Sequence, residues 1–170
     1  TAVVFSLADA TWVSRSYRTA TIFLLDHSYS IPQDVQRKTI DWINDQIKKL
    51  PKDDIAGVVL FGSEAMIEVP PSERPVLVGP NTIVARASTD IGAAIRLALA
   101  IFPEGYQRRL VLVSDGNENR GHALAEAEVA RAHGAVIDVF PLRYDYPNEV
   151  WIESLHSPTD VVPKEPYEIT

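Results

Sequence analysis

The chain has 170 residues, which is enough for one domain and at most a fragment of a second. It is 46% hydrophobic and 23% charged, its net charge is −7, and no basic cluster is interleaved with aromatic residues. These values predict a globular domain with a substantial core, and they argue against binding of nucleic acid or anionic lipid. The sequence has no cysteine, which excludes disulfides and thiolate metal sites.

The first half of the chain predicts a strand, a helix and a hairpin. Residues 19–25 form a continuous β-prone apolar run, typical of a strand that is buried on both faces of a parallel sheet. Residues 32–50 carry large apolar side chains at spacings of three and four, which predicts an amphipathic helix. Residues 55–61 predict a second buried strand, and residues 64–69 predict its antiparallel partner at the edge of the sheet.

The second half begins with a proline-rich stretch. Residues 70–88 predict a surface loop, with a short strand near residues 76–78. The remaining segments predict, in order, a helix, a buried strand, a helix and a strand: residues 89–102, 109–114, 122–133 and 135–142.

Strands that alternate with helices in this way predict a doubly wound α/β fold. We expect a mostly parallel central sheet with one antiparallel edge strand, and helices on both of its faces. Ligands of such sheets bind beyond the carboxyl ends of the strands, where the strand order reverses. If residues 19–25 and 109–114 form neighbouring strands, the polar residues that follow them meet at one edge.

A carboxylate and two hydroxyls follow the first strand at a spacing of two, in Asp26, Ser28 and Ser30. Oxygen ligands of this kind suit a small hard cation such as Mg²⁺. The alternative is that Ser30 caps the next helix, because Ser30 to Gln33 has the S-x-x-Q form of a capping box. The short D-x-S-x-S pattern, taken alone, favours the capping interpretation.

Two later segments carry further oxygen ligands. Thr89 precedes the predicted helix 89–102, and Asp115 follows a buried strand in an Asp-Gly turn. Each has a simpler explanation, because threonine often caps a helix and Asp-Gly is a frequent turn dipeptide.

These segments together resemble the metal-ion-dependent adhesion site of von Willebrand factor A (VWA) domains. The family pattern is D-x-S-x-S, then a threonine at a helix start, then an aspartate in a D-G turn. The matching residues are Asp26, Ser28, Ser30, Thr89 and Asp115. The resemblance spans roughly residues 19–142, and it implies a Rossmann-like VWA fold over residues 19–145.

The resemblance also implies a cofactor and a partner. A Mg²⁺ or Mn²⁺ ion would be held by the hydroxyls, with the carboxylates binding directly or through water. In the family, an acidic side chain of a partner protein fills the open position. This agrees with elementary electrostatics, because an ion that neutral hydroxyls leave electrophilic favours one more anionic oxygen.

Three residues are assigned to the rim of this site. His27 and Tyr29 occupy positions that smaller residues often hold in the family, and Asn117 follows the Asp-Gly turn. His27 is a rim side chain and not a ligand, because hard cations prefer oxygen. The segment 117–119 either hydrogen-bonds the site or forms a solvated loop, and we favour the loop.

Three functions are compatible with these residues. The first is a binding module without catalysis, to which no catalytic residue is assigned. The second is a Mg²⁺-dependent enzyme of phosphoryl transfer or hydrolysis, but the chain has no Walker A loop, G-x-S-x-G, H-E-x-x-H or G-x-G-x-x-G, and His27 is the one candidate base. The third is a structural domain with a non-functional metal site, which the intact set of oxygen ligands disfavours.

The two ends of the chain carry separate expectations. Residues 1–18 are either the exit of a membrane helix or an edge strand, and residues 146–170 predict a last strand of the sheet or the start of a following β-sandwich, which we favour. Residues 7–13, 114–119 and 154–158 resemble the bacterial membrane-anchored subset of the family. That resemblance implies a place on the outer side of a bacterial cytoplasmic membrane, with an anchor outside the given sequence.

Overall fold

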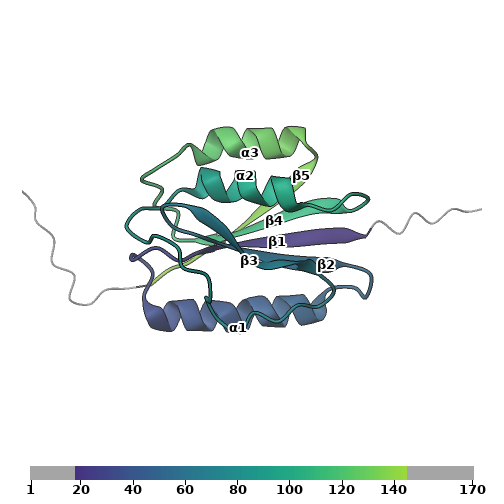
Figure 1. Cartoon of the computed structure of the whole chain (residues 1–170), viewed down its shortest axis with the longest axis horizontal. Coiled ribbons are helices and arrows are strands. Elements are labelled where there is room, and N and C mark those ends of the chain that lie inside the picture. The colour runs from purple at the N-terminus through teal and green to yellow at the C-terminus, as the bar shows by residue number, and fades with distance from the viewer. Residues whose placement is uncertain (1–17, 145–170) are drawn as a thin grey trace, which may run out of the picture.

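The computed structural model describes residues 18–144, and its centre is a five-stranded sheet in the order β3-β2-β1-β4-β5 (Figure 1). The strands are β1 (Thr19–Asp26), β2 (Ile55–Phe61), β3 (Ala65–Ser72), β4 (Gln107–Ser114) and β5 (Ala135–Pro141). β1 pairs in parallel with β2 and β4, β4 pairs in parallel with β5, and β3 pairs antiparallel with β2. The predicted sheet, with its single antiparallel edge strand, is confirmed.

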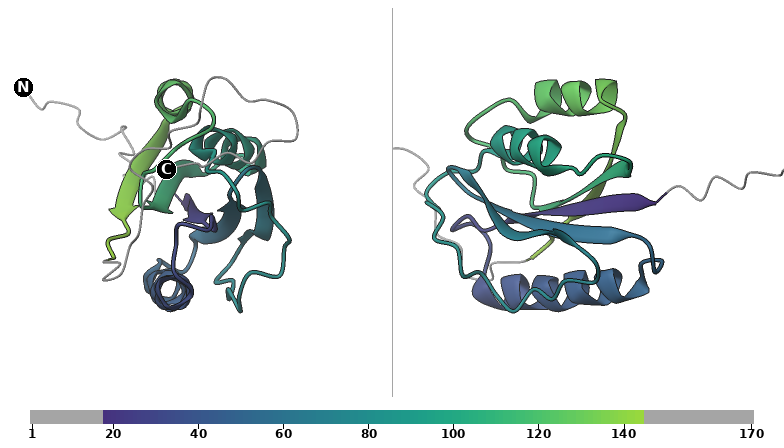
Figure 2. Two further views of the ribbon diagram at one scale, coloured as in Figure 1. Left: turned by 90° about the vertical axis from the view of Figure 1, so that its left-hand side faces the viewer. Right: turned by 45° about the vertical axis from the view of Figure 1, so that its right-hand side comes forward.

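Three helices cover the two faces of the sheet. α1 (Gln33–Lys49) lies on one face, and α2 (Ile91–Ile101) and α3 (Ala123–Ala132) lie side by side on the other, as the left panel of Figure 2 shows. Two separate cores result, one under α1 and one under α2 and α3. The predicted doubly wound α/β architecture is therefore confirmed.

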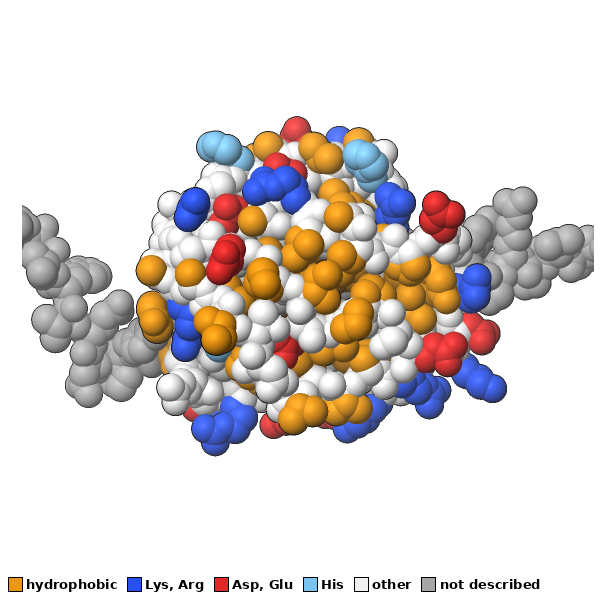
Figure 3. Space-filling model, in the orientation of Figure 1, with side chains coloured by type: hydrophobic (Ala, Val, Ile, Leu, Met, Phe, Trp, Pro, Cys, Tyr) orange, Lys and Arg blue, Asp and Glu red, His pale blue; other side chains and the backbone are white. Residues whose placement is uncertain are grey.

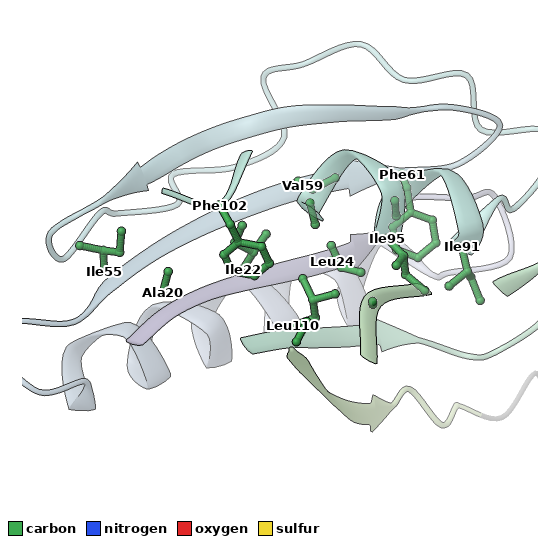
Figure 4. Close-up of a cluster of buried hydrophobic side chains, with 14 residues drawn as sticks. Ala20, Ile22, Leu24, Ile55, Val59, Phe61, Ile91, Ile95, Phe102 and Leu110 are labelled. Carbon is green, nitrogen blue, oxygen red and sulfur yellow. The ribbon is translucent and has the colours of Figure 1, made fainter. Parts of the chain in front are cut away.

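Alternate side chains of β1 enter the two cores. Ile22 and Leu24 point toward α2, where they pack in the cluster shown in Figure 4. Phe23 and Leu25 point toward α1, and none of these four side chains is more than 3% exposed. A strand that is buried on both faces needs apolar residues at every position, which explains the continuous apolar run in the sequence.

The short strand expected near residues 76–78 is wrong. Leu77 is buried, but its backbone N–H donates to Oδ1 of Asn44 at 2.9 Å, and its carbonyl accepts from Nδ2 of Asn44 at 2.8 Å. Because one amide side chain of α1 satisfies both backbone groups, this segment needs no partner strand.

The helix starts exclude both capping interpretations of the sequence. Asp90 is the N-cap of α2, and its Oδ1 accepts from the backbone N–H of Ala93 at 2.6 Å. Pro32 holds the N-cap position of α1 and makes no capping hydrogen bond with its side chain. Thr89 and Ser30 are therefore not the N-cap residues of these helices.

No helix within residues 18–144 is long and apolar enough to cross a bilayer. The predicted membrane-helix exit or edge strand before residue 18 lies outside the described residues, and so does the predicted last strand or β-sandwich start after residue 145.

Candidate metal site

The carboxyl ends of β1 and β4 meet at one edge of the sheet, onto which the left panel of Figure 2 looks. Asp26 is the last residue of β1, and Ser114 is the last residue of β4. The Ser114 hydroxyl donates to Oδ2 of Asp26 at 2.7 Å, and both residues are buried. The expectation that these two strands are neighbours is confirmed.

The loop after β1 folds back onto the Asp26 carboxylate. The backbone N–H of Ser28 donates to Oδ1 of Asp26 at 2.9 Å. The hydroxyl oxygens of Ser28 and Ser30 lie 2.8 Å apart. The spacing of two in the sequence thus brings one carboxylate and two hydroxyls into a single turn.

Asp115 joins this loop from the end of β4. Its Oδ1 accepts from the backbone N–H of Asn117 at 3.0 Å, and its Oδ2 accepts from the Tyr144 hydroxyl at 2.5 Å. Ser30 also hydrogen-bonds the Asp115 carboxylate. Four of the predicted ligands, Asp26, Ser28, Ser30 and Asp115, therefore lie together.

Thr89 is held at this edge by its backbone. Its N–H donates to Oδ1 of Asn119 at 2.8 Å, and its carbonyl accepts from the N–H groups of Asn119 and Arg120, both at 3.2 Å. The side chain is buried, yet its Oγ1 makes no hydrogen bond to any residue of the described part. The hydroxyl is free to act as a ligand.

The position of Thr89 relative to Asp26 follows from β2. Phe61 is the register partner of Asp26 on β2, and Gly62 comes next in the chain. The carbonyl of Gly62 accepts from the N–H of Asp90 at 2.8 Å, which ties the start of α2 to the same edge. Thr89 thus borders the edge that carries the other four residues, without a direct contact between its hydroxyl and theirs.

The two carboxylates differ in their environments. Burial raises the pKa of Asp26 above its ordinary 3.8, hydrogen bonds from Ser114 and Ser28 oppose the rise, and the charge of Asp115 adds to it. Burial also acts to raise the pKa of Asp115, but hydrogen bonds from Tyr144, Asn117 and Ser30 outweigh it and hold that pKa below 3.8. A cation between them would stabilise the buried Asp26 anion.

The donor set fits Mg²⁺ or Mn²⁺. It consists of oxygen only, from two carboxylates and three hydroxyls, and hard divalent cations prefer such ligands. Within residues 18–144 there is no group of three or more His, Cys, Asp and Glu side chains that could hold a metal ion. An ion at this edge would therefore depend on the serine and threonine hydroxyls.

The rim residues lie in different environments. Tyr29 is 72% exposed, and Asn117 is also exposed, so both can reach a partner. His27 is half-buried and interacts with the Gln36 side chain of α1. Burial lowers the pKa of His27, and the positive charge of Arg86 lowers it further.

Two residues for which the sequence favoured a solvated loop, Glu118 and Asn119, organise this edge. Glu118 accepts from the backbone N–H of Gly92 at 3.2 Å and from that of Ala123 at 2.8 Å, so it joins the starts of α2 and α3. Asn119 holds Thr89, and the solvated-loop interpretation is therefore wrong for both residues. The one available signal was their place directly after a buried strand and an Asp-Gly turn.

Comparison with known proteins agrees with this geometry. The family model for the von Willebrand factor type A domain matches residues 21–118. An aerotolerance-related membrane protein from Bacteroides fragilis is 28% identical, with a TM-score of 0.62 over 72% of this chain and 67% of that chain. BatB from Bacteroides thetaiotaomicron is also 28% identical, with a TM-score of 0.63 over 72% of this chain and 66% of that chain.

A more distant structure shares the fold. It is proximal thread matrix protein 1 from the mussel byssus, described with a zinc-occupied metal-ion-dependent adhesion site, and it is 18% identical with a TM-score of 0.61 over 72% of this chain and 37% of that chain. No curated protein matches the sequence significantly. The match to the family model covers more than half of the sequence, and the chain belongs to the von Willebrand factor type A domain family.

Proposed function

We propose that this domain is a divalent-metal-dependent protein-binding module that takes an acidic residue of a partner protein at Asp26, Ser28, Ser30, Thr89 and Asp115. The observation that carries the proposal is the contact of four of these residues at the carboxyl edge of the sheet, with Thr89 held at the same edge by its backbone. The family agrees with this function, because VWA domains generally mediate protein–protein interactions.

The hydroxyls of Ser28, Ser30 and Thr89 would hold the ion, and the carboxylates of Asp26 and Asp115 would bind it directly or through water. A bound Mg²⁺ or Mn²⁺ supplies positive charge and a coordination position for one more anionic oxygen. The zinc described in the mussel protein belongs to that protein, and at 18% identity the likeness supports the fold alone. The argument for a metal rests on the donors of this chain.

The enzyme alternative gains no support from the position of its candidate base. His27 is half-buried and its side chain hydrogen-bonds Gln36 of α1, and no hydrogen bond joins its imidazole to a proposed ligand within residues 18–144. A general base needs hydrogen-bond reach to the proton that it abstracts.

We also propose that the protein is attached to a bacterial cytoplasmic membrane, with this domain on the outer side. The support is the 28% identity to two Bacteroides proteins, one of which is described as a membrane protein. Protease treatment of intact spheroplasts tests the orientation, and protection of the domain would contradict it.

Thermal unfolding with and without MgCl₂ or MnCl₂ tests the metal site. We expect the ion to raise the unfolding midpoint, because a ligand at 100 times its Kd stabilises the folded state by about 2.7 kcal/mol. Asp26→Ala should abolish the rise. Thr89→Val should reduce it while leaving the metal-free midpoint nearly unchanged, because the lost hydroxyl has no hydrogen bond to a described residue and, unlike the Thr21 hydroxyl, is not fully buried.

Thr21→Val is the matched control for Thr89→Val. Thr21 is also a buried threonine, but it lies five residues before Asp26 on β1, about 16 Å from the site at the usual rise of a strand. This variant should keep the full metal response. A wild type without any metal response would favour the structural-domain alternative, and turnover of a phosphate ester that His27→Ala abolishes would favour the enzyme.

A further inference from the structure

One arginine side chain contacts three successive residues of the loop that follows β1. Arg86 lies between β3 and α2, and its Nε donates to the carbonyl of His27 at 2.6 Å. Its Nη2 makes a longer contact of 3.4 Å to the carbonyl of Ser28. The guanidinium carbon also lies over the ring of Tyr29, 4.8 Å from its centroid. Arg86 therefore holds the middle of the D-x-S-x-S segment through these contacts with His27, Ser28 and Tyr29, which we call the Arg86 clasp.

The backbone of Arg86 is tied to the same loop. Its carbonyl accepts from the N–H of Tyr29 at 3.0 Å. The preceding carbonyl, of Ala85, accepts from the N–H of Ser63 at 2.7 Å, in the turn after β2. The arginine is thus anchored to the sheet, and its side chain is half-buried where it meets the loop.

These contacts bear on the proposed metal ligands through geometry. The carbonyls of His27 and Ser28 belong to the two peptide groups that flank Ser28, so fixing both carbonyls fixes the direction of the Cα–Cβ bond of Ser28 and limits where its hydroxyl can lie. Hydroxyls are weak neutral donors, and they bind an ion well only when the protein holds them in place in advance. A loop without this clasp would have to be ordered by the ion itself.

The charge of Arg86 cannot explain a gain in metal affinity. A guanidinium near a divalent cation repels it, so the charge alone weakens binding. If Arg86 acted only through its charge, its removal would tighten metal binding. If it acts by holding the loop, its removal weakens metal binding, and the two effects have opposite signs.

We propose that Arg86 is a positioning residue for the metal ligands, which it orients by hydrogen bonds to the His27 and Ser28 carbonyls and by its contact with Tyr29. The inference rests on the proposed function, because it requires that this edge of the sheet binds a divalent ion. Arg86 itself touches neither the ion nor the partner.

Calorimetric titration of residues 1–170 with MnCl₂ tests the proposal. Arg86→Met keeps an unbranched apolar side chain and loses the guanidinium donors, and it should weaken Mn²⁺ binding roughly 10-fold or more, as is usual for groups that orient metal ligands. Arg86→Lys should recover part of the affinity, because an ammonium can donate to one carbonyl but cannot span both.

The control is Arg37→Ala, which removes an exposed arginine of α1 and should leave the affinity unchanged. A second readout needs no metal. Hydrogen exchange of the metal-free protein should be faster at the amides of Tyr29 and Ile31 in Arg86→Met, and unchanged in β1, because the clasp acts on the loop alone.

Wild-type or tighter Mn²⁺ binding by Arg86→Met would overturn the inference. If that variant does not fold, full affinity in Arg86→Lys would overturn it in the same way. The proposed function fails separately: it falls if the wild type shows no saturable Mn²⁺ binding, whereas loss of binding in Asp26→Ala together with full binding in Arg86→Met would remove only the role of Arg86.

Discussion

Two buried threonines, Thr21 in the sheet and Thr89 just before α2, differ in what surrounds their hydroxyls. Thr89 lies at the carboxyl edge of the sheet, where its hydroxyl is a proposed metal ligand. Thr21 lies on β1, and its Oγ1 is fully buried without a hydrogen-bond partner among residues 18–144. A buried hydroxyl without a partner keeps the cost of its desolvation and gains nothing in return.

Thr21→Val should therefore stabilise the domain. Valine has nearly the same shape and removes the unpartnered hydroxyl, so we expect the free energy of unfolding to rise by about 1 kcal/mol. Urea denaturation of the metal-free protein measures it. An unchanged or lower free energy of unfolding would mean that the hydroxyl is satisfied in solution.

Among contacts between single residues, the sequence predicts those between residues close together in the chain and does not predict those between residues far apart in the chain. The turn that joins Asp26 to Ser28 spans two residues, so its geometry can be read from the D-x-S spacing. The hydrogen bond from Ser114 to Asp26 spans 88 residues, and that from Tyr144 to Asp115 spans 29. Neither can be inferred before the neighbours of each strand are known.

The turn between β2 and β3 positions the segment that leads to α2. A Cβ atom on Gly62 would lie 2.4 Å from the carbonyl oxygen of Ala85. Since real Cβ contacts with backbone are essentially never this short, only glycine allows the two backbones to meet here. The residues that follow Ala85 include Arg86 and Thr89, so this approach supports both the clasp and the proposed ligand.

Gly62→Ala should destabilise the domain and reduce its metal response. Forcing a methyl group against backbone typically costs about 1–3 kcal/mol, and the shift it causes would move Thr89 away from Asp26. Gly79→Ala is the control, because a Cβ atom there meets nothing within 4 Å. Denaturation and MnCl₂ titration of both variants measure the effect, and equal behaviour of the two would contradict it.

The existence of each helix and strand could be predicted because the hydrophobic periodicity is strong. The exact residue at which a helix begins could not. Residues 55–61 were assigned to a strand from their apolar run alone, and β2 has these bounds. The start of α2 was assigned to Thr89, but Asp90 is the cap. Thr and Asp both cap helices, so the sequence cannot decide between adjacent candidates.

The whole molecule is acidic, and this bears on its proposed partner. The net charge is −7, and on the face shown in Figure 3 basic and acidic side chains are interspersed around a central apolar area. An acidic domain repels an acidic partner at long range. A divalent ion at the edge of the sheet would reverse the sign of the potential at the place where we propose that a partner carboxylate binds.

Partner capture should therefore depend on the metal. We expect protein captured on the immobilised domain from an extract of the native organism to be released by EDTA and recovered with MnCl₂, and to be absent with Asp26→Ala. Mass spectrometry of the eluates with and without chelator measures this. Capture that survives EDTA would contradict metal-bridged binding.

The path of the chain after β5 has a mechanical consequence. The backbone N–H of Leu142 donates to the carbonyl of Ser114 at 2.9 Å, and two residues later the Tyr144 hydroxyl donates to Asp115. These are the last described residues, and both are fastened to the end of β4. Tyr144 also packs against the core under α1, so tension applied beyond residue 144 would act on that core and, through the Tyr144 hydroxyl, on Asp115. The carboxylate that we propose as a metal ligand would therefore also bear a mechanical load from that side of the chain.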